Sequence, residues 1–330
     1  MTAAVNQGAT GASIPSTTDS KTTLICGSLA FDKIMQYHGR FADTLIAGQM
    51  HRVNVSFLVP TLRTEYGGCA ANIAYNLAML GGDPLIMATI GQDGGDYLDR
   101  FAKQGISTRG IRTIGHAYTA QCFVTADEDN NQINAFHPGA MQFSHENSVA
   151  EQGPLRVAII APDGRDGMLK HATDLAAQGV PFMFDPGQQL PMFNGDELRD
   201  FVAKASYLAA NDYEFEMLVE RTGLSADEIA SQLDALIVTR GADGSEIFAN
   251  GERMVIPPVE AAAVVDPTGC GDAYRAGLLY GIANGYDWGT TGRLASLLGS
   301  IKIAHQGGQN HSFTRDSVSA QFEAAFGYKI

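Results

Sequence analysis

The sequence is poor in basic residues and contains no long apolar run. Its 330 residues include 22 Lys and Arg against 36 Asp and Glu, which gives a formal charge of −14. A net field of that sign repels phosphate backbones and anionic lipid surfaces, so we expect neither nucleic acid nor a membrane as partner. No run of about 18 apolar residues occurs, which excludes a membrane-spanning helix.

Cysteine is also scarce, and common nucleotide-binding motifs are missing. The four cysteines, at 26, 69, 122 and 270, show no CxxC or CxxH spacing, so a zinc site or a disulfide framework is not expected. This pattern predicts a reducing, cytoplasmic setting. There is no GxxxxGK[ST] loop, and no GxGxxG follows the first predicted strand, which disfavours a Rossmann dehydrogenase.

The first 21 residues are small, polar and aperiodic. They lack the basic and apolar regions of a secretory signal, and we interpret them as a disordered tail. Residues 22–330 then predict one α/β unit. From residue 155, short apolar runs alternate with helical patterns, which is typical of a doubly wound, mostly parallel sheet flanked by helices.

Two other regions, at about 33–63 and 116–138, show the alternation of half-exposed strands. The stretch 53–57 is an example in the first region. In the second region, 121–126 and 132–136 predict a hairpin. We expect these strands to form a small β-sheet that projects from the main sheet as a lid.

The stretch 265–277, VDPTGCGDAYRAG, places small residues directly before a helical pattern. Its glycines allow close backbone approach, and the free N–H groups of residues 269–272 at a positive helix end predict an anion site. Asp272 is either a helix cap or a general base beside that site, and the residues alone leave both open.

Two stretches resemble signatures of the ribokinase-like (PfkB) carbohydrate kinases. Residues 266–272, DPTGCGD, resemble the C-terminal signature, and residues 67–72, GGCAAN, resemble the N-terminal one. Order and spacing match over roughly residues 23–310, and the pair is far more specific than either stretch alone.

The resemblance implies that Asp272 is the catalytic base. It also implies that Gly269, Cys270 and Gly271 form the anion hole. Cys270 departs from the family, which usually has Ala or another small residue there. Its thiol is either an oxidation-sensitive group near the site or a small buried filler.

The same resemblance implies ATP as phosphoryl donor with Mg²⁺, and it allows a monovalent cation such as K⁺. Glu214 would organise Mg²⁺ through water, and Asn211 would lie near the ATP phosphates. The alternative is that this pair is a helix N-cap with its box partner three residues later, and both interpretations can hold together. The remaining nucleotide-binding residues are expected to be Thr239, Arg240, Gly241, Gly244 and Gly271.

The stretches 131–141, 184–190 and 211–214 resemble the bacterial nucleoside kinases of the adenosine-kinase-like branch. The implied reaction is ATP-dependent phosphorylation of the 5′-hydroxyl of a ribonucleoside, adenosine or a related purine nucleoside. Substrate-binding residues would be Ser28, Asp32, Gly68, Asn72, Phe136, Gln188, Gln189 and Asp272. The alternatives are a kinase for ribose or a hexose, and a non-catalytic nucleoside sensor.

Phe136 would stack on the base, but it could equally be a core residue of the lid or part of a dimer interface. Related enzymes have an aromatic residue where this chain has Cys122, so Phe123 or Phe57 is expected to contact the base instead. A homodimer through the lid is also expected. We expect His137, His305 and His311 to be solvated or structural, because none has ligand spacing.

Overall fold

The computed structural model describes residues 20–45, 54–129 and 131–330. Its main layer is a nine-stranded sheet with the order β13-β12-β11-β10-β9-β8-β1-β4-β5. All pairs are parallel except β11–β12 and β12–β13, which form the antiparallel edge. The strands are β1 (Thr22–Cys26), β4 (Asp83–Gly91), β5 (Ile111–Ile114), β8 (Val157–Ile160), β9 (Phe182–Phe184), β10 (Tyr207–Asn211), β11 (Ala235–Thr239), β12 (Ser245–Ala249) and β13 (Glu252–Ile256).

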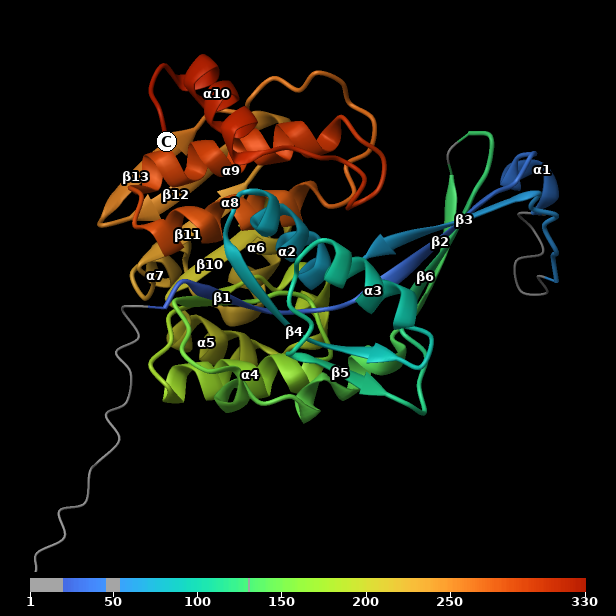
Figure 1. The fold of residues 1–330 in the computed structure, drawn as a ribbon, viewed down its shortest axis with the longest axis horizontal. Helices are drawn as coiled ribbons and strands as arrows, with labels where there is room; N and C mark the ends of the chain where they lie inside the picture. The colour runs from blue at the N-terminus through green and yellow to red at the C-terminus, as the bar shows by residue number, and fades with distance from the viewer. Residues whose placement is uncertain (1–19, 46–53, 130) are drawn as a thin grey trace, which may run out of the picture.

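Helices cover both faces of this sheet, as Figure 1 shows. Two separate apolar clusters define the faces. One contains residues of α2 (Cys69–Met79), α3 (Gly95–Lys103), α8 (Cys270–Asn284), α9 (Trp288–Ile303) and α10 (Arg315–Phe326). The other contains residues of α4 (Arg165–Ala177), α5 (Gly195–Lys204), α6 (Asp212–Thr222) and α7 (Ala226–Ala230). The predicted doubly wound α/β fold is confirmed.

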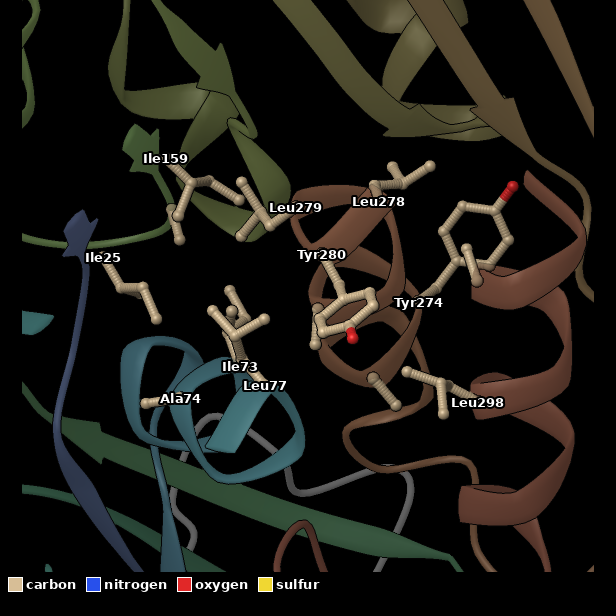
Figure 2. Packing of buried hydrophobic residues seen from close by; sticks show 14 of the residues in the cluster. Ile25, Ile73, Ala74, Leu77, Ile159, Tyr274, Leu278, Leu279, Tyr280 and Leu298 are labelled. Carbon is tan, nitrogen blue, oxygen red and sulfur yellow. The ribbon is translucent and has the colours of Figure 1, made fainter. Parts of the chain in front are cut away.

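Strand periodicity decides which cluster each side chain joins. In β1, Ile25 points to the first cluster, while Leu24 and Cys26 point to the second. Figure 2 shows Ile25 and Ile159 facing Ile73 of α2 and Leu279 of α8. Each such fully buried aliphatic side chain contributes roughly 1.5–3 kcal/mol of transfer free energy, so this layer holds α8 firmly against the sheet.

Glycine brings α8 and α9 unusually close together. A Cβ on Gly277 would lie 2.5 Å from the Cα of Ala295, so no side chain fits at this crossing. The contact matters for the site, because the first turn of α8 begins with Cys270 at the end of the sheet. A firmly packed α8 therefore fixes the position of its N-terminus.

A second, four-stranded sheet has the order β3-β2-β6-β7 and projects from the body (Figure 1). Its strands are β2 (Ala30–Gln36), β3 (Thr61–Gly67), β6 (Ala120–Ala126) and β7 (Gln132–His137), with the short helix α1 (Phe41–Thr44) near its outer end. The hairpin predicted at 121–136 is confirmed. The exact bounds of the small sheet as a lid, 33–63 and 116–138, stay a prediction.

The strand predicted at 53–57 is wrong for residues 54–57, which have no regular secondary structure. The strand begins at Thr61, after Pro60, which has no N–H to donate. Phe57 instead packs its ring 4.9 Å from Tyr37 and 5.0 Å from Phe41.

The connections include the 3₁₀ segments η2 (Gly139–Glu146), η3 (Val149–Gln152), η4 (Gly187–Met192) and η5 (Gly241–Asp243). In the part of the chain that the structure describes, no helix has the length and apolarity to cross a bilayer. The tail predicted at 1–21 lies, up to residue 19, outside the described residues.

Candidate active site

The site lies at the carboxyl end of β1. This strand sits between β4 and β8, and the chain continues from these two neighbours toward opposite edges of the sheet. Such a switch point leaves a crevice where open α/β sheets bind ligands. Ser28 follows β1 and is 6% exposed. Its Oγ accepts a 3.2 Å hydrogen bond from the N–H of Cys69, which ties β1 to the start of α2.

Two glycines create the space for Asp32. A Cβ on Gly67 would lie 2.5 Å from Oδ2 of Asp32, and one on Gly68 would lie 2.5 Å from the carbonyl oxygen of Ser28. Gly68 also has φ of 93°, which favours glycine. Asp32 is half-buried, and none of the described residues donates a hydrogen bond to its carboxylate. Burial first, and then neighbouring carboxylates, raise its pKa to about 6.

The first turn of α8 presents unpaired donors. The N–H groups of Gly269, Gly271 and Asp272 have no acceptor among the residues that the structure covers. The N–H of Cys270 donates to the carbonyl oxygen of Pro267 at 3.1 Å. The predicted anion hole is therefore corrected at Cys270, because a tight turn at Pro267 already uses that donor. The free N–H groups of Gly269, Gly271 and Asp272 remain available for an anion.

Asp272 faces this helix end and is partly accessible to solvent. Its Oδ2 accepts a 2.8 Å hydrogen bond from Nδ2 of Asn72 on α2. Burial first, and then the charge of Asp185, raise the pKa of Asp272 to about 6 against the opposing effects of the Asn72 hydrogen bond and the Arg275 charge. A carboxylate with a pKa near neutrality suits a general base. The two predicted site residues thus meet directly.

A buried chain of hydrogen bonds orients Asn72, and the sequence did not point to it. Gln309 Nε2 donates to Asn72 Oδ1 at 3.0 Å and to the Tyr97 hydroxyl oxygen at 2.8 Å. The Tyr97 hydroxyl in turn donates to the carbonyl oxygen of Gly67 at 2.7 Å. With its oxygen committed to Gln309, Asn72 must turn its NH₂ group toward Asp272. The adjacent Gly307-Gly308 pair is the signal that could have indicated this loop.

Lys302 joins the two loops around the anion site. Its side chain is fully buried, and Nζ donates to the carbonyl oxygens of Asp266 at 2.7 Å and His305 at 3.0 Å. The Asp266 carboxylate also accepts the N–H of Gly307 at 2.8 Å. A Cβ on Gly308 would lie 2.5 Å from Asn72 Oδ1, so the loop approaches the site closely.

Arg275 and Asp185 form a buried ion pair beside Asp272. They are 5% and 4% exposed, and Nε and Nη2 of Arg275 each donate at 3.1 Å to one oxygen of Asp185. Neither residue was predicted to have a role. Asp185 directly follows β9, at the same end of the sheet as Ser28. This position is a signal that could have found it.

On the substrate side, the strand register places Phe136 with Asp32. Asp32 pairs with Cys122, and Cys122 pairs with Phe136, so the three side chains share one face of the small sheet. Phe136 is 52% exposed. Phe123 lies on the opposite face, so the prediction that it replaces an aromatic at position 122 is wrong. Phe57 packs against Tyr37, and its contact with a base stays a prediction.

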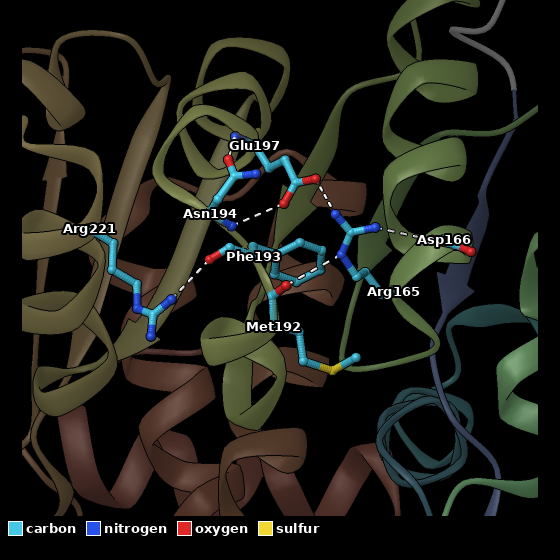
Figure 3. Close-up of polar contacts among 7 residues, drawn as sticks. All are labelled: Arg165, Asp166, Met192, Phe193, Asn194, Glu197 and Arg221. Atoms are coloured by element: carbon cyan, nitrogen blue, oxygen red, sulfur yellow. Dashed lines mark hydrogen bonds and ion pairs between the residues drawn. The ribbon is translucent and has the colours of Figure 1, made fainter.

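Gln188 and Gln189 lie on η4, near the start of α2. Gln188 is exposed, with Nε2 4.0 Å from Sγ of Cys69, and Gln189 is 9% exposed. The end of η4 is held by a polar network (Figure 3). Arg165 Nε donates to the carbonyl oxygen of Met192, and Arg221 Nη1 donates to that of Phe193.

On the nucleotide side, Asn211 and Glu214 form a capping box at the start of α6. Asn211 Oδ1 accepts the Glu214 N–H at 2.7 Å, and Glu214 Oε2 accepts the Asn211 N–H at 2.9 Å. The alternative interpretation as a helix cap is therefore confirmed. It leaves a phosphate-binding role possible, because a capped helix end still attracts anions.

The loop after β11 carries the other predicted nucleotide-binding residues. Thr239 ends the strand, and the Arg240 N–H donates to the carbonyl oxygen of Gly244 at 2.8 Å, which closes the loop around Gly241. The Arg240 guanidinium pairs with Glu246 of β12. The loop lies beside Asn211, since β10 and β11 are parallel neighbours and Asn211 pairs with Thr239.

The residues fit a hydrated Mg²⁺ shared with a nucleotide. Across the described ranges no group of three or more acidic, His or Cys side chains could hold an ion alone. Glu214 Oε1 has no partner there, although Oε2 is used in the cap. Mg²⁺ keeps several waters and is commonly held by one or two carboxylates plus substrate phosphates.

A monovalent cation does not fit beside the anion site. A monovalent cation needs converging carbonyl oxygens, and the pair from Asp266 and His305 is not available to it, because that pair already binds the Lys302 ammonium. The histidines behave as predicted: His137 and His305 are exposed, and His311 is buried with Nε2 2.7 Å from Asn76 Oδ1. Burial lowers the pKa of His311 to about 4.

Comparisons with known proteins agree with this geometry. The family model "pfkB family carbohydrate kinase" matches residues 28–315. A nucleoside kinase of Methanocaldococcus jannaschii is 31% identical over 272 residues, which is 82% of this chain and 89% of that protein.

Solved structures of a Burkholderia thailandensis nucleoside kinase match more closely. Its complex with inosine is 52% identical, with a TM-score of 0.85 over 93% of this chain and 99% of that one. Its complex with ADP-inosine is 53% identical, with a TM-score of 0.82 over 93% and 97%. Because the family match spans most of the chain and includes both glycine-rich stretches of the site, this chain belongs to the pfkB family of carbohydrate kinases and is a phosphotransferase with an alcohol acceptor.

Proposed function

We propose that the protein is a nucleoside kinase that transfers the γ-phosphoryl group of ATP to the 5′-hydroxyl of a ribonucleoside. A purine nucleoside, adenosine or a relative such as inosine, is the proposed acceptor. The observation that carries this proposal is the 52% identity, over 93% of the chain, to a nucleoside kinase solved with inosine. The site supports it independently, as follows.

Asp32 suits a ribose diol. Its half-buried carboxylate has no donor among the described residues, and two hydroxyl groups could satisfy both oxygens. Phe136 shares the face of Asp32 and is 52% exposed, so its ring is available to stack on a base. A free sugar would leave this aromatic surface without a partner.

The transfer itself uses the start of α8. The 5′-oxygen of the nucleoside attacks the γ-phosphorus, its proton passes to the Asp272 carboxylate, and the bond to the β-phosphate oxygen breaks, which releases ADP. The free N–H groups of Gly269, Gly271 and Asp272 would stabilise charge on the group in transfer. Mg²⁺, when bound, would neutralise phosphate charge near Glu214.

The nucleotide would lie across the ends of β10 and β11. Asn211 at the start of α6 and the loop from Thr239 to Gly244 flank that position. The small sheet would then act as a lid over the nucleoside and exclude water, which competes as acceptor. A homodimer through this sheet and a cytoplasmic location stay predictions.

An acceptor panel tests the proposal. The protein is incubated with ATP·Mg²⁺ and with adenosine, inosine, guanosine, cytidine, ribose or a hexose, and ADP and phosphorylated product are measured. We expect turnover with purine nucleosides and little with free sugars. Turnover of ribose without turnover of nucleosides would reject the proposal in favour of a sugar kinase. Nucleoside binding without any transfer would indicate a sensor.

A further inference from the structure

Arg275 is an arginine with one side-chain nitrogen left over. It lies one helical turn after Asp272 on α8 and is 5% exposed. Nε and Nη2 are both used by Asp185. No residue in the described ranges accepts a hydrogen bond from Nη1. A guanidinium stays charged at any physiological pH, and Nη1 is not one of the buried side-chain atoms that lack a partner, so it is open to solvent or to a ligand.

Nη1 lies at the anion site. Gly271 has no side chain, and a Cβ built on it would be 3.7 Å from Nη1 of Arg275. Gly271 itself is exposed, and its N–H is one of the free donors of the first turn of α8. The free nitrogen of Arg275 and these free N–H groups therefore lie at the same helix end.

The charges around Arg275 support an anionic ligand. Asp185, Asp272 and Glu214 all act on the guanidinium, and together they raise its pKa although burial opposes this. Three carboxylates around one cation leave the pocket negative, which would repel the phosphates of ATP. A cation with a free donor at this point offsets that repulsion where the phosphates must enter.

We propose that Arg275 is a catalytic residue whose Nη1 binds the phosphoryl group during transfer, and that Asp185 is the positioning residue that holds it there. This rests on the proposed kinase reaction. Asp185 binds the Nε–Nη2 edge of the planar guanidinium with both of its oxygens, so Nη1 at the other end is aimed without loss of side-chain freedom at the moment of reaction. Stabilisation of developing charge by such a pre-aligned donor is typical of phosphoryl transfer.

The decisive test separates charge stabilisation from simple packing. Arg275→Ala alone should lower kcat by roughly 10²–10³, the usual effect of losing one such donor. The substitution also leaves the buried Asp185 carboxylate without its partner, which can unfold the protein. The double variant Arg275→Met with Asp185→Leu replaces the pair by apolar groups of similar size. Apolar replacement of a buried ion pair is often neutral for stability.

We expect the double variant to keep its Tm and its nucleoside Kd but to show the same loss of kcat. Added guanidinium ion, below denaturing concentration, should partly restore kcat of Arg275→Ala, whereas urea should not. Arg199→Met, at the surface of α5, is the matched control and should be unchanged. Wild-type kcat in the double variant would overturn the proposal.

Failure of the proposed kinase function can be told apart from failure of the inference about Arg275, because the two are measured on different proteins. If the wild-type protein phosphorylates a sugar and no nucleoside, the same variants are measured with that sugar, and the inference about Arg275 stands or falls on its own. If the wild type transfers phosphoryl to no acceptor in the panel, the proposed function is rejected, and with it the catalytic role of Arg275.

Discussion

The amide of Asn72 on α2 donates a 2.8 Å hydrogen bond to Oδ2 of Asp272 on α8, 200 positions later in the chain. The bond joins the two glycine-rich stretches of the sequence at one carboxylate. It favours the ionised form of that carboxylate, whereas burial favours the neutral form. The balance leaves the pKa of Asp272 at about 6, so the group is ionised at neutral pH but remains able to take a proton.

The rate of transfer should therefore fall in acid. Below the pKa of about 6 Asp272 is protonated and cannot accept a hydrogen, so kcat should rise with pH through that value and then level off. Asn72→Leu removes the hydrogen bond that opposes the raised pKa. The acid limb should move to higher pH by about one to two units. Measurement of kcat from about pH 5 to pH 8 in both proteins checks this; an unmoved limb would contradict it.

Asp272→Asn distinguishes a base from a helix cap. In the structure Gly269 is the N-cap of α8 and no side chain caps this helix, so the loss of the Asp272 charge should leave stability nearly unchanged, while kcat should drop by about 10²–10⁴ because no base remains. Nucleoside Kd, measured by calorimetry, should change little. The control is Asp287→Asn at the start of α9, where the side chain does cap the helix by accepting the Thr290 N–H at 2.9 Å. If both variants keep full activity, Asp272 is only structural.

Gly67→Ala should impair nucleoside binding selectively. The new Cβ would lie 2.5 Å from Oδ2 of Asp32, so the carboxylate proposed to hold the ribose must move. A displaced contact to both hydroxyls should raise KM for the nucleoside by about tenfold or more, with KM for ATP little changed. Gly95→Ala is the matched control, because nothing lies within 4 Å of its Cβ. Equal KM values in both variants would remove Asp32 from the site.

The enzyme should not need a monovalent cation. The Lys302 ammonium already bridges Asp266 and His305 next to the anion site, so K⁺ has no vacant carbonyl pair there. Activity in K⁺, Na⁺ and tetramethylammonium buffers of equal ionic strength should agree within about twofold. Lys302→Met should lower Tm, since it removes two hydrogen bonds from a fully buried side chain to the carbonyl oxygens of Asp266 and His305. Strong activation of the wild type by K⁺ would show that a cation binds elsewhere.

Cys270 should be unreactive despite its place in the first turn of α8. Burial raises the pKa of its thiol to about 11, with the Lys302 charge opposing this, so almost no thiolate exists at neutral pH. Cys270→Ala should keep kcat within about twofold, because the Cys270 N–H that closes the turn is unchanged and the thiol makes only a weak 3.9 Å contact with the carbonyl oxygen of Asp266. Mass spectrometry after treatment with iodoacetamide should find Cys270 largely unmodified. Rapid alkylation with loss of activity would favour the oxidation-sensitive alternative.

Much of the fold follows from local pattern. Short apolar runs that alternate with helical periodicity predicted the parallel sheet. The hairpin of β12 and β13 forms one edge of this sheet, as the turn residues between the two strands predicted. The stretch at 53–57 misled because alternation alone cannot detect a missing partner strand. There the aromatic ring of Phe57 packs against the rings of Tyr37 and Phe41 instead.

The site was only partly readable in the same way. Gly68, Asn72 and Asp272 stand in conspicuous glycine-rich stretches. The structure brings the Asn72 amide and the Asp272 carboxylate together. Gln309 stands in no such pattern, and Arg275, although it lies within the stretch 265–277, shows no sign there of its partner Asp185. Their roles depend on partners at positions 72 and 185, which become neighbours only when the chain has folded.

Composition, periodicity and glycine placement in the chain itself determined the layered architecture and which helix end carries free N–H groups suited to an anion, because these depend on backbone geometry over a few residues. Tertiary packing decided the rest: the direction of the Asn72 amide, the free nitrogen of Arg275, and the shared face of Asp32 and Phe136. Hydrogen bonds need donor and acceptor aligned to within a few tenths of an ångström, and only the packed assembly of distant segments sets distances that finely.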